Sequence, residues 1–358
     1  MRIWAFHLLN DYSGSPLMLK NTLKALEDHA EIYLWTSESK GFLSGLNSCH
    51  FHPNSYSWSK GKLGLLLKLI QAQLEAFFLV LRNRKKIDVV YINTLLPAGA
   101  ALAAKLLAIP VIYHLHEPQL NNRFLFRLLK AVAIGTADKA VFVSSYLQRS
   151  FPELTEKGQV IPNVLSEDFL QRIVRSEISN RKSILMLCSF KPYKGIEAFA
   201  SLAKTDPARP YCLILNAPEN QIQDFRQKHR EIKNLSIESS PADLHPLYQE
   251  ARILLNLSHP DSWIESFGMT ALEGMAYGLP CIVPEVGGIA ELVNEASGFK
   301  CSVFELDKIT RRIDFLLSDD RIYIEYSRSA LQRSQEYAFP HFKAQLLSFM
   351  GFAHEFAS

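Results

Sequence analysis

Two carboxylates beside a predicted helix start are the groups in this chain whose spacing best suits chemistry. Glu265 and Glu273 stand eight positions apart, and Ser266-Phe267-Gly268 directly follows the first. This segment predicts a helix start, where unpaired N–H groups and the positive end of the helix dipole bind anions. Eight helical residues rise about 12 Å and turn by about 80°, so the two carboxylates would contact different parts of one long ligand. Because a carboxylate beside an anion is costly unless it accepts hydrogen bonds, the pattern predicts hydroxyl groups from a sugar or ribose.

Alternating strand and helix patterns are the elements that must position these groups. The predicted strands are 2–8, 31–36, 88–93, 111–115 and 140–143 in the first half, and 183–188, 211–215, 234–237, 252–257 and 280–283 in the second. The predicted helices are 98–107, 194–204, 219–230, 243–250, 267–277, 287–294 and 305–317, and helical patterns interrupted at Pro340 follow Asp319. Such alternation is typical of βαβ units, which build parallel sheets. The predicted fold class is therefore α/β.

The length of 358 residues suits about two domains. The composition breaks at 160–164, so we predict an N-terminal domain over 1–163 and a C-terminal domain over 164–339. A C-terminal helix over 340–358 is a candidate to pack back onto the first domain. The two domains are expected to face a central cleft, because open α/β sheets bind ligands at the carboxyl ends of their strands. The dinucleotide motif G-x-G-x-x-G and the Walker A motif are absent.

The composition is that of a globular protein, with 48% hydrophobic and 21% charged residues. These values exclude a mainly disordered chain, a collagen-like repeat and a polytopic membrane protein. The five cysteines are far apart and lack zinc-ligand spacing, so neither a disulfide framework nor a metal site is expected. The first residues lack the charged and apolar regions of a secretory signal. We therefore expect a cytoplasmic protein.

Positive charge is concentrated in the N-terminal half. Residues 1–165 carry 18 Lys and Arg against 11 Asp and Glu, and the remainder carries 21 against 25. Much of the excess flanks apolar runs in 60–86, but polar residues interrupt these runs, so a transmembrane helix is not expected. Two interpretations stay open for this stretch: a core helix with solvated ends, or a helix that lies on an anionic membrane surface. A second basic apolar segment, 123–130, favours membrane contact.

The segment around the two carboxylates resembles a known family. Glu265 and Glu273 lie in E-S-F-G-M-T-A-L-E-G-M-A-Y-G-L-P, which Gly287-Gly288-x-x-Glu291 follows. This pattern resembles the signature of the family-4 retaining glycosyltransferases of the GT-B fold, in which two Rossmann-like domains face each other and the C-terminal one holds a nucleotide-sugar donor. The resemblance implies that Glu265 binds donor-sugar hydroxyls and Glu273 ribose hydroxyls. The diphosphate is then expected at the N–H groups of Phe267, Gly268 and Met269.

Two N-terminal motifs resemble donor-binding elements of the same family. The family carries a Gly-rich loop after the first strand, near the donor phosphates, and Ser13-Gly14 stand there with one glycine where two are usual. An ordinary turn capped by Ser13 or Ser15 is the alternative. The family also places a histidine at the end of a mid-domain strand, near the donor sugar. Strand alternation puts His114 and His116 on one face of the sheet. His116 lies at the strand end and therefore matches the position of the family histidine better than His114 does.

A motif after the first strand of the second half resembles the one that neutralises the diphosphate. The family has roughly G-R-x-x-x-x-K-G, and this chain has Cys188-Ser189-Phe190-Lys191-Pro192-Tyr193-Lys194-Gly195. Lys194 therefore matches the family lysine, whereas Ser189 replaces the arginine. Lys191 is the candidate to supply the missing charge, although an ammonium group is a point charge and not a bidentate fork.

Glycosyl transfer requires the departure of a nucleoside diphosphate and the deprotonation of an acceptor hydroxyl. The resemblance implies a UDP- or GDP-linked donor, retention of the anomeric configuration, and same-face attack with the leaving phosphate as base. Glu265, His116 and Lys194 form the expected catalytic set. No D-x-D sequence is present, so we expect no bound metal ion and no cofactor besides the donor.

The expected reaction transfers a sugar to a glycan or lipid-linked acceptor in polysaccharide biosynthesis, in the cytoplasm or in peripheral contact with the inner face of the cell membrane. Ser189 supports a rival interpretation, a catalytically inactive GT-B protein that binds nucleotide sugars or serves in an assembly. A GT-B sugar-nucleotide 2-epimerase is a further alternative, which normally has different carboxylate and histidine spacings. No nucleic-acid partner is expected, because the basic patch lacks a recognisable RNA- or DNA-binding module.

Overall fold

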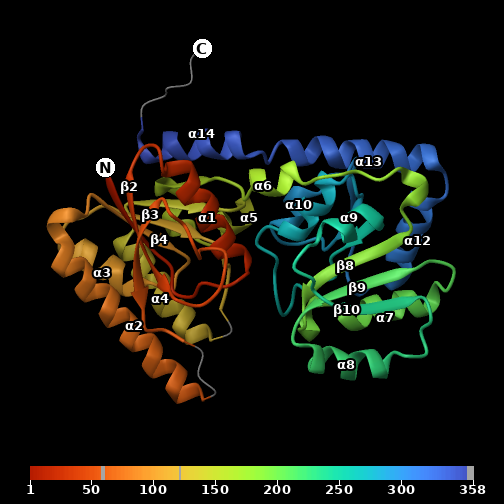
Figure 1. Ribbon diagram of the computed structural model, residues 1–358, viewed down its shortest axis with the longest axis horizontal. Coiled ribbons are helices and arrows are strands. Elements are labelled where there is room, and N and C mark those ends of the chain that lie inside the picture. Colours follow the sequence, from red (N-terminus) through yellow and green to blue (C-terminus); the bar gives the residue numbers. More distant parts are fainter. Residues whose placement is uncertain (58–60, 121, 353–358) are drawn as a thin grey trace, which may run out of the picture. The chain divides into compact units, whose positions relative to one another are not determined.

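The computed structural model describes residues 1–57, 61–120 and 122–352, so Lys60 of the basic stretch and the side chain of Lys62 lie outside the description. The chain divides into two compact units (Figure 1): residues 1–164 together with the C-terminal helix from Phe339, and residues 165–338. Each unit is built around a parallel sheet with helical connections. The predicted α/β class with two Rossmann-like domains is confirmed.

The first unit holds, in its described residues, a seven-stranded sheet in the order β3-β2-β1-β4-β5-β6-β7, and every neighbouring pair is parallel. Its strands are β1 (Arg2–Phe6), β2 (Glu31–Ser37), β3 (Cys49–Asn54), β4 (Val89–Asn93), β5 (Val111–Leu115), β6 (Lys139–Phe142) and β7 (Gly158–Val160). Its helices are α1 (Gly14–Leu26), α2 (Lys62–Asn83), α3 (Ala98–Leu106), α4 (Arg123–Thr136), α5 (Ser145–Arg149) and α14 (Phe339–Met350). The central strands are apolar and almost fully buried, as strands covered on both faces must be.

The second unit holds a six-stranded parallel sheet, counted over the described chain, in the order β10-β9-β8-β11-β12-β13. Its strands are β8 (Ser183–Ser189), β9 (Tyr211–Asn216), β10 (Leu235–Ser239), β11 (Ala251–Leu255), β12 (Cys281–Val283) and β13 (Gly298–Lys300). Its helices are α6 (Glu167–Gln171), α7 (Ile196–Thr205), α8 (Glu219–Lys228), α9 (His245–Glu250), α10 (Met269–Ala276), α11 (Ile289–Leu292), α12 (Leu306–Leu317) and α13 (Asp320–Gln335). Apolar side chains from α7, α8 and α12 pack on this sheet to form its core.

Several elements differ from the sequence expectations. The strands β3, β7 and β13 and the helix α1 are not predicted. The helix expected from Lys194 begins at Ile196, because Gly195 has a left-handed φ of 78° that ends a short 3-10 turn over Pro192–Lys194. The helix expected over 287–294 is one turn, Ile289–Leu292. Pro340 lies in the first turn of α14, where proline is tolerated because it needs no hydrogen-bond acceptor there.

The C-terminal helix α14 packs against α1 in the first unit. Its inner face carries Phe339, Phe342, Leu346 and Leu347, all buried. The ammonium of Lys343 lies 3.1 Å from the carboxylate of Asp28, just after α1. This helix, which follows the second unit in the sequence, is therefore an integral part of the first unit.

The strand orders locate one switch point in each sheet, where chain connections leave in opposite directions. In the first sheet this point lies between β1 and β4, and in the second between β8 and β11. Open α/β sheets bind ligands outside the carboxyl ends of the strands at such points. The segments that follow these four strands are therefore the places to look for functional side chains.

Candidate functional site

An ion pair lies at the switch point of the second sheet. Lys194, in the turn after β8, pairs with Glu265, in the loop after β11. The Ser258 hydroxyl donates a second hydrogen bond to the same carboxylate, at 2.8 Å. Both charged side chains are mostly buried, with exposed fractions of 15% for Lys194 and 17% for Glu265. The structure thus brings together two residues to which the sequence assigns separate roles.

The backbone of Glu265 is fixed by the glycine pair that follows β12. The N–H of Gly288 donates to the carbonyl oxygen of Glu265 at 2.8 Å. Gly287 has a φ of 107°, and a Cβ at this position would lie 2.5 Å from the same carbonyl oxygen. Only glycine suits both the conformation and the close approach. The Gly287-Gly288 pair therefore supports the loop that carries the carboxylate.

The start of α10 leaves backbone donors open. Gly268 precedes the helix with a φ of 101° and provides no side-chain cap. Among the described residues, the N–H groups of residues 267–270 have no hydrogen-bond acceptor. Gly268 and Met269 are partly exposed, whereas the Phe267 side chain is buried against Tyr337. The helix start can therefore offer N–H groups to an anion, while the phenyl ring of Phe267 serves packing.

Glu273 lies further along α10 and pairs with a buried tyrosine. The Tyr248 hydroxyl, on α9, donates to the Glu273 carboxylate. Burial raises the pKa of Glu273 to about 7, although the hydrogen bond from Tyr248 lowers it. Because a carboxyl group with this pKa is partly protonated at neutral pH, its ability to accept hydrogen bonds from hydroxyls depends on pH.

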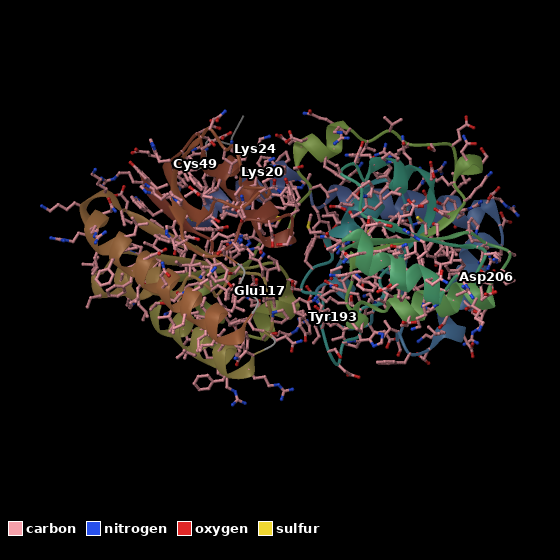
Figure 2. All side chains as sticks on the ribbon, turned by 60° about the horizontal axis from the view of Figure 1, so that its bottom comes forward. Lys20, Lys24, Cys49, Glu117, Tyr193 and Asp206 are labelled. Carbon is pink, nitrogen blue, oxygen red and sulfur yellow. The ribbon has the colours of Figure 1, made fainter. Side chains whose placement is uncertain are left out.

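Ser189, which replaces the family arginine, and Lys191, the candidate to supply its charge, lie differently from Lys194. Ser189 ends β8, and its carbonyl oxygen accepts a hydrogen bond from the N–H of Lys191 at 2.8 Å. The Lys191 side chain is exposed. Next to Lys194, the rings of Tyr193 and Trp263 stack with centroids 5.5 Å apart, and the Lys194 ammonium lies over the Trp263 ring at 5.5 Å. This aromatic pair, of which Figure 2 labels Tyr193, is not predicted from the sequence.

The loop after β1 places Ser13 and Gly14 at the start of α1. Ser13 is the N-cap residue, but its hydroxyl donates to the Asp11 carboxylate at 2.5 Å and does not cap the helix. Both residues are exposed, and in the described part of the chain the N–H groups of Gly14 and Ser15 have no acceptor. A second helix start with open donors therefore lies at the switch point of the first sheet.

His116 follows β5 in the first unit and is buried. Its Nε2 lies 2.9 Å from Oδ1 of Asn93, the last residue of β4. Burial, together with the neighbouring His114 and His7, holds the pKa of His116 well below its usual range. The rings of His114 and His116 have centroids 4.3 Å apart, as strand alternation predicts, but His114 is fully buried and its Nδ1 lies 2.8 Å from the Tyr91 hydroxyl.

Three polar residues at these sites are missed by the sequence analysis. Asn93 contacts both His116 and His7, and Tyr248 contacts Glu273. Glu117, labelled in Figure 2, has a buried carboxyl group whose pKa burial raises to about 7. Asn93 could have been found from its position at the carboxyl end of a strand beside the switch point. Tyr248 has no such signal, because its sequence position lies in an ordinary helix.

The described residues contain no group of three or more His, Cys, Asp or Glu side chains that could hold a metal ion. The chemistry that they offer is hydrogen bonding and charge: in the second unit a lysine, an open helix start and two carboxylates, and in the first unit an open helix start and a neutral histidine. Such groups can hold a diphosphate and several hydroxyls, and can stabilise the charge of a departing phosphate.

Comparison with known proteins decides the family. Residues 13–169 match the family described as Glycosyltransferase Family 4, and residues 170–335 match the Glycosyl transferases group 1. This chain belongs to the family-4, group 1 glycosyltransferases. The two matches adjoin within α6, near the boundary between the units. The resemblance inferred from the motifs is thus confirmed, and the chain is a glycosyltransferase.

Relatives of this glycosyltransferase agree with the assignment. It is 26% identical over 297 residues to the N-acetyl-alpha-D-glucosaminyl L-malate synthase of Bacillus anthracis, a match that covers 74% of this chain and 73% of the relative. The structure of HepE of Anabaena in complex with UDP-glucose aligns with a TM-score of 0.78 at 18% identity, over 99% of this chain and all of that one. The sucrose-phosphate synthase of Thermosynechococcus elongatus aligns with a TM-score of 0.80 at 14% identity, over 98% of both chains. These structures confirm the GT-B fold.

Proposed function

We propose that this glycosyltransferase moves a sugar from a UDP- or GDP-linked donor to a glycan or lipid-linked acceptor in polysaccharide biosynthesis, with retention of the anomeric configuration and without a bound metal ion. Lys194 and the N–H groups at the start of α10 stabilise the leaving diphosphate, with Lys191 as a further positive charge. Glu265 holds hydroxyls of the donor sugar, and Glu273 holds those of the ribose. The leaving phosphate takes the proton of the acceptor hydroxyl.

The Lys194–Glu265 pair beside the open start of α10 is the observation that carries this proposal. A lysine mostly removed from water acts more strongly on a nearby phosphate than an exposed one does. Its partner carboxylate fixes the ammonium in place and keeps a second oxygen for other donors. The complexes of HepE with UDP and with UDP-glucose support a nucleotide-sugar ligand for the same fold.

Release of nucleoside diphosphate tests the proposal. The protein is incubated with individual UDP- and GDP-sugars, with and without glycan or lipid-linked acceptors, and the UDP or GDP formed is quantified. We expect release from one donor class, loss of release in Glu265→Gln, and wild-type release in Glu219→Gln, which removes an exposed ion pair with Arg226 on α8. The anomeric configuration of the product, measured by NMR, tests retention. An inverted product would contradict the proposed mechanism.

Ser189 favours one other function. Because this serine stands where the family has an arginine, the protein can instead be an inactive GT-B subunit that binds nucleotide sugars within an assembly. Binding of a donor that stabilises the fold against heat, with no release of nucleoside diphosphate under any condition above, would favour this second function.

The surface of the first unit supports an acceptor at a membrane. Ten of the eighteen exposed large hydrophobic side chains among the described residues lie on α2, α3 and α4. In Figure 1 these three helices belong to the same unit, and α3 contacts both α2 and α4. The exposed residues are Leu63, Leu66, Leu67, Ile70, Leu74 and Phe78 on α2, Leu102 and Leu106 on α3, and Phe124 and Leu128 on α4. An apolar patch of this extent on a protein surface marks an interaction site.

The helix α2 is apolar on two opposite faces. Ala72, Ala76 and Val80 are buried on the face that packs in the unit, and a Cβ on Gly99 of α3 would lie 2.1 Å from the Gln73 carbonyl oxygen. The exposed leucines, Ile70 and Phe78 lie on the other side of the helix, at roughly 100° per residue. By length and composition, 63–86 could also cross a membrane. Its close packing with α3 supports contact along the membrane surface instead.

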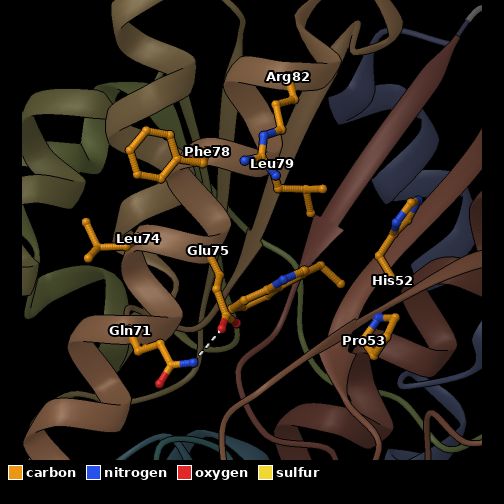
Figure 3. Close-up of a pocket in the computed structure, with 9 residues that line it drawn as sticks. His52, Pro53, Gln71, Leu74, Glu75, Phe78, Leu79 and Arg82 are labelled. Carbon is orange, nitrogen blue, oxygen red and sulfur yellow. Dashed lines mark hydrogen bonds between the residues drawn. The ribbon is translucent and has the colours of Figure 1, made fainter.

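A pocket of about 380 Å³ lies beside this apolar face, between α2 and the strands β2 and β3. Figure 3 shows Leu74, Leu79 and Phe78 on one side of it, His52 and Pro53 on the other, and the Arg82 guanidinium near Leu79. The apolar wall and the Arg82 cation at its edge suit an amphiphile whose anionic group lies by Arg82 and whose hydroxyls face the Glu75 carboxylate, which also lines the pocket. This arrangement supports a lipid-linked acceptor that docks from an anionic membrane.

Sedimentation with vesicles tests the membrane contact. We expect the wild type to sediment with phosphatidylcholine vesicles that contain phosphatidylglycerol and not with phosphatidylcholine alone. The double variant Leu67→Glu/Ile70→Glu should lose this binding, whereas Val174→Glu, which charges a somewhat more exposed apolar side chain of the second unit, should keep it. If the wild-type protein does not sediment with the anionic vesicles but dimerises through α2, the proposed membrane contact is contradicted.

A further inference from the structure

Asn93 occupies the centre of a polar network at the switch point of the first sheet. It is the last residue of β4 and is fully buried. Its Nδ2 lies 3.1 Å from the carbonyl oxygen of Ser15, in the first turn of α1, and 3.0 Å from Nδ1 of His7, just after β1. Its Oδ1 lies 2.9 Å from Nε2 of His116, just after β5. One side chain at the end of β4 therefore joins the segments that follow its two neighbouring strands, β1 and β5.

The Ser15 contact fixes which way the Asn93 amide points. A carbonyl oxygen only accepts hydrogen bonds, so the atom of Asn93 that faces Ser15 must be the NH2 group. The Asn93 oxygen then faces His116, and Nε2 of His116 must carry a hydrogen. Because burial keeps this imidazole neutral, its Nδ1 has no hydrogen and retains a lone pair.

A strained residue follows Asn93 directly. Thr94 has a φ of 74°, a left-handed conformation that β-branched residues rarely adopt. Its N–H donates to the carbonyl oxygen of His114 at 2.9 Å, and its hydroxyl accepts from the N–H of Leu96 at 3.2 Å. Strain of this kind persists only where the surrounding contacts maintain it, and it concentrates at functional sites. The strained turn ends β4 at Asn93 and keeps the amide at the switch point.

We propose that Asn93 is a positioning residue that holds His116 in its Nε2–H form and ties it to the first turn of α1, so that Nδ1 keeps the lone pair with which it can accept a hydrogen bond from a ligand hydroxyl. The inference rests on the proposed glycosyltransferase function and on the family resemblance, which implies that His116 lies near the donor sugar. The titratable groups that surround His116 are His7 after β1, His114 on β5 and Glu117, the next residue in the chain. None of them supplies a second acceptor to Nε2, which leaves Asn93 as the residue that decides the protonated nitrogen.

The first test reads the histidine directly and needs no activity. Nitrogen-15 NMR of the histidine-labelled wild type at neutral pH distinguishes a protonated from an unprotonated ring nitrogen, and the spectrum of His116→Gln identifies the signals of residue 116. We expect a neutral ring with a hydrogen on Nε2. A hydrogen on Nδ1, or a doubly protonated ring, would overturn the proposal even if the protein proved to be a glycosyltransferase.

The second test uses Asn93→Asp and Asn93→Leu in the donor assay. Asn93→Asp places a carboxylate beside Nε2, which favours the charged imidazole, so the acid limb of the pH–kcat profile should move up by about one pH unit. Asn93→Leu should lower kcat about tenfold or more, since the buried Nε2–H loses its acceptor. Asn234→Asp is the matched control, because the Asn234 amide also donates to backbone carbonyls, in the second unit. It should lower the melting temperature and keep the wild-type profile.

The two tests separate failure of this inference from failure of the proposed function. An unchanged pH profile in a folded Asn93→Asp variant would reduce Asn93 to a structural residue and contradict the inference. If no donor gives turnover, the NMR test still decides the tautomer, and its expected result would support the positioning role in a binding protein.

Discussion

The two switch points occupy the same place in similar sheets but use opposite chemistry. In the first unit the histidines near the open start of α1 are buried and neutral: burial lowers the pKa of His7 to about 4 and holds that of His116 well below the usual value. In the second unit a lysine and a glutamate form a mostly buried ion pair beside open N–H groups. The sheet topology determines where a ligand can bind. The local residues determine whether that place provides neutral hydrogen-bonding groups in fixed positions or charged groups.

This difference suggests a division of work between the units. Fixed, neutral hydrogen-bonding groups discriminate hydroxyl positions, because an ill-placed partner leaves a buried polar group unpaired. Charges and helix starts stabilise a diphosphate whatever sugar it carries. Substitutions that change charge should therefore act most strongly in the second unit.

Glu265→Gln should have the largest effect on catalysis. The neutral amide leaves the Lys194 ammonium without its counter-charge and removes an acceptor for sugar hydroxyls. We expect kcat to fall by about 100-fold or more, with little change in the donor KM. Steady-state kinetics against donor concentration measure both quantities. A kcat within about threefold of the wild-type value would contradict the proposal that charged groups of the second unit carry the catalytic effect.

Gly268→Ala should destabilise the second unit. The residue has a φ of 101°, and a Cβ would lie 2.6 Å from the Ile289 side chain. We expect a loss of about 2 kcal/mol in the free energy of unfolding, measured with urea.

The matched substitution is Gly14→Ala at the start of α1. Gly14 is exposed and is not among the residues with positive φ, so its replacement should leave the stability near the wild-type value. An equal loss of unfolding free energy in Gly268→Ala and Gly14→Ala would show that both helix starts require glycine, which would contradict the difference drawn between the two units.

Glu273→Gln should weaken donor binding without slowing the chemical step. A carboxylate accepts hydrogen bonds from hydroxyls more strongly than an amide oxygen does, so we expect the donor KM to rise about tenfold with kcat retained. The test is a comparison of KM and kcat with those of Glu265→Gln. A fall in kcat with an unchanged KM would reverse the roles of the two glutamates.

The pH dependence of donor binding should give the smallest effect. Since burial raises the pKa of Glu273 to about 7, a falling pH protonates this group near neutrality, and the donor KM should rise as the pH drops from about 8 to about 6. Tyr248→Phe removes the hydrogen bond that lowers this pKa, so the rise in KM should begin at a higher pH. His116 remains neutral over the same interval, so kcat should not follow the change. A donor KM that is flat across this interval in both proteins would contradict an ionised Glu273 as the binding form.

The central part of the fold could be predicted from the sequence, and most of its edges could not. The strands β1, β4, β5 and β8 are short apolar runs between helical patterns, because both of their faces are buried. The edge strand β3 has the sequence C-H-F-H-P-N, and the edge strands β7 and β13 have only three residues each. Partly exposed edge strands need neither apolar runs nor length, so no pattern marks them.

The candidate site shows the same limit. Glu265, Glu273, Lys194 and His116 stand in local motifs that the sequence displays. The contact between Lys194 and Glu265 joins positions 71 apart, and local spacing carries no information about such a pair. Asn93 was missed for another reason: an asparagine at the end of a strand is typical of a turn, and the strand order is needed to show that this strand end lies at the switch point.

The position of α14 has a consequence for how the chain is made. This helix, which packs on α1, is synthesised after the whole second unit. Synthesis must therefore pass through the whole second unit before the first unit receives its final piece, and the nascent N-terminal unit waits with the apolar face of α1 uncovered. A nonsense mutation just before the codon of Phe339 should consequently damage the unit of the enzyme that was translated first.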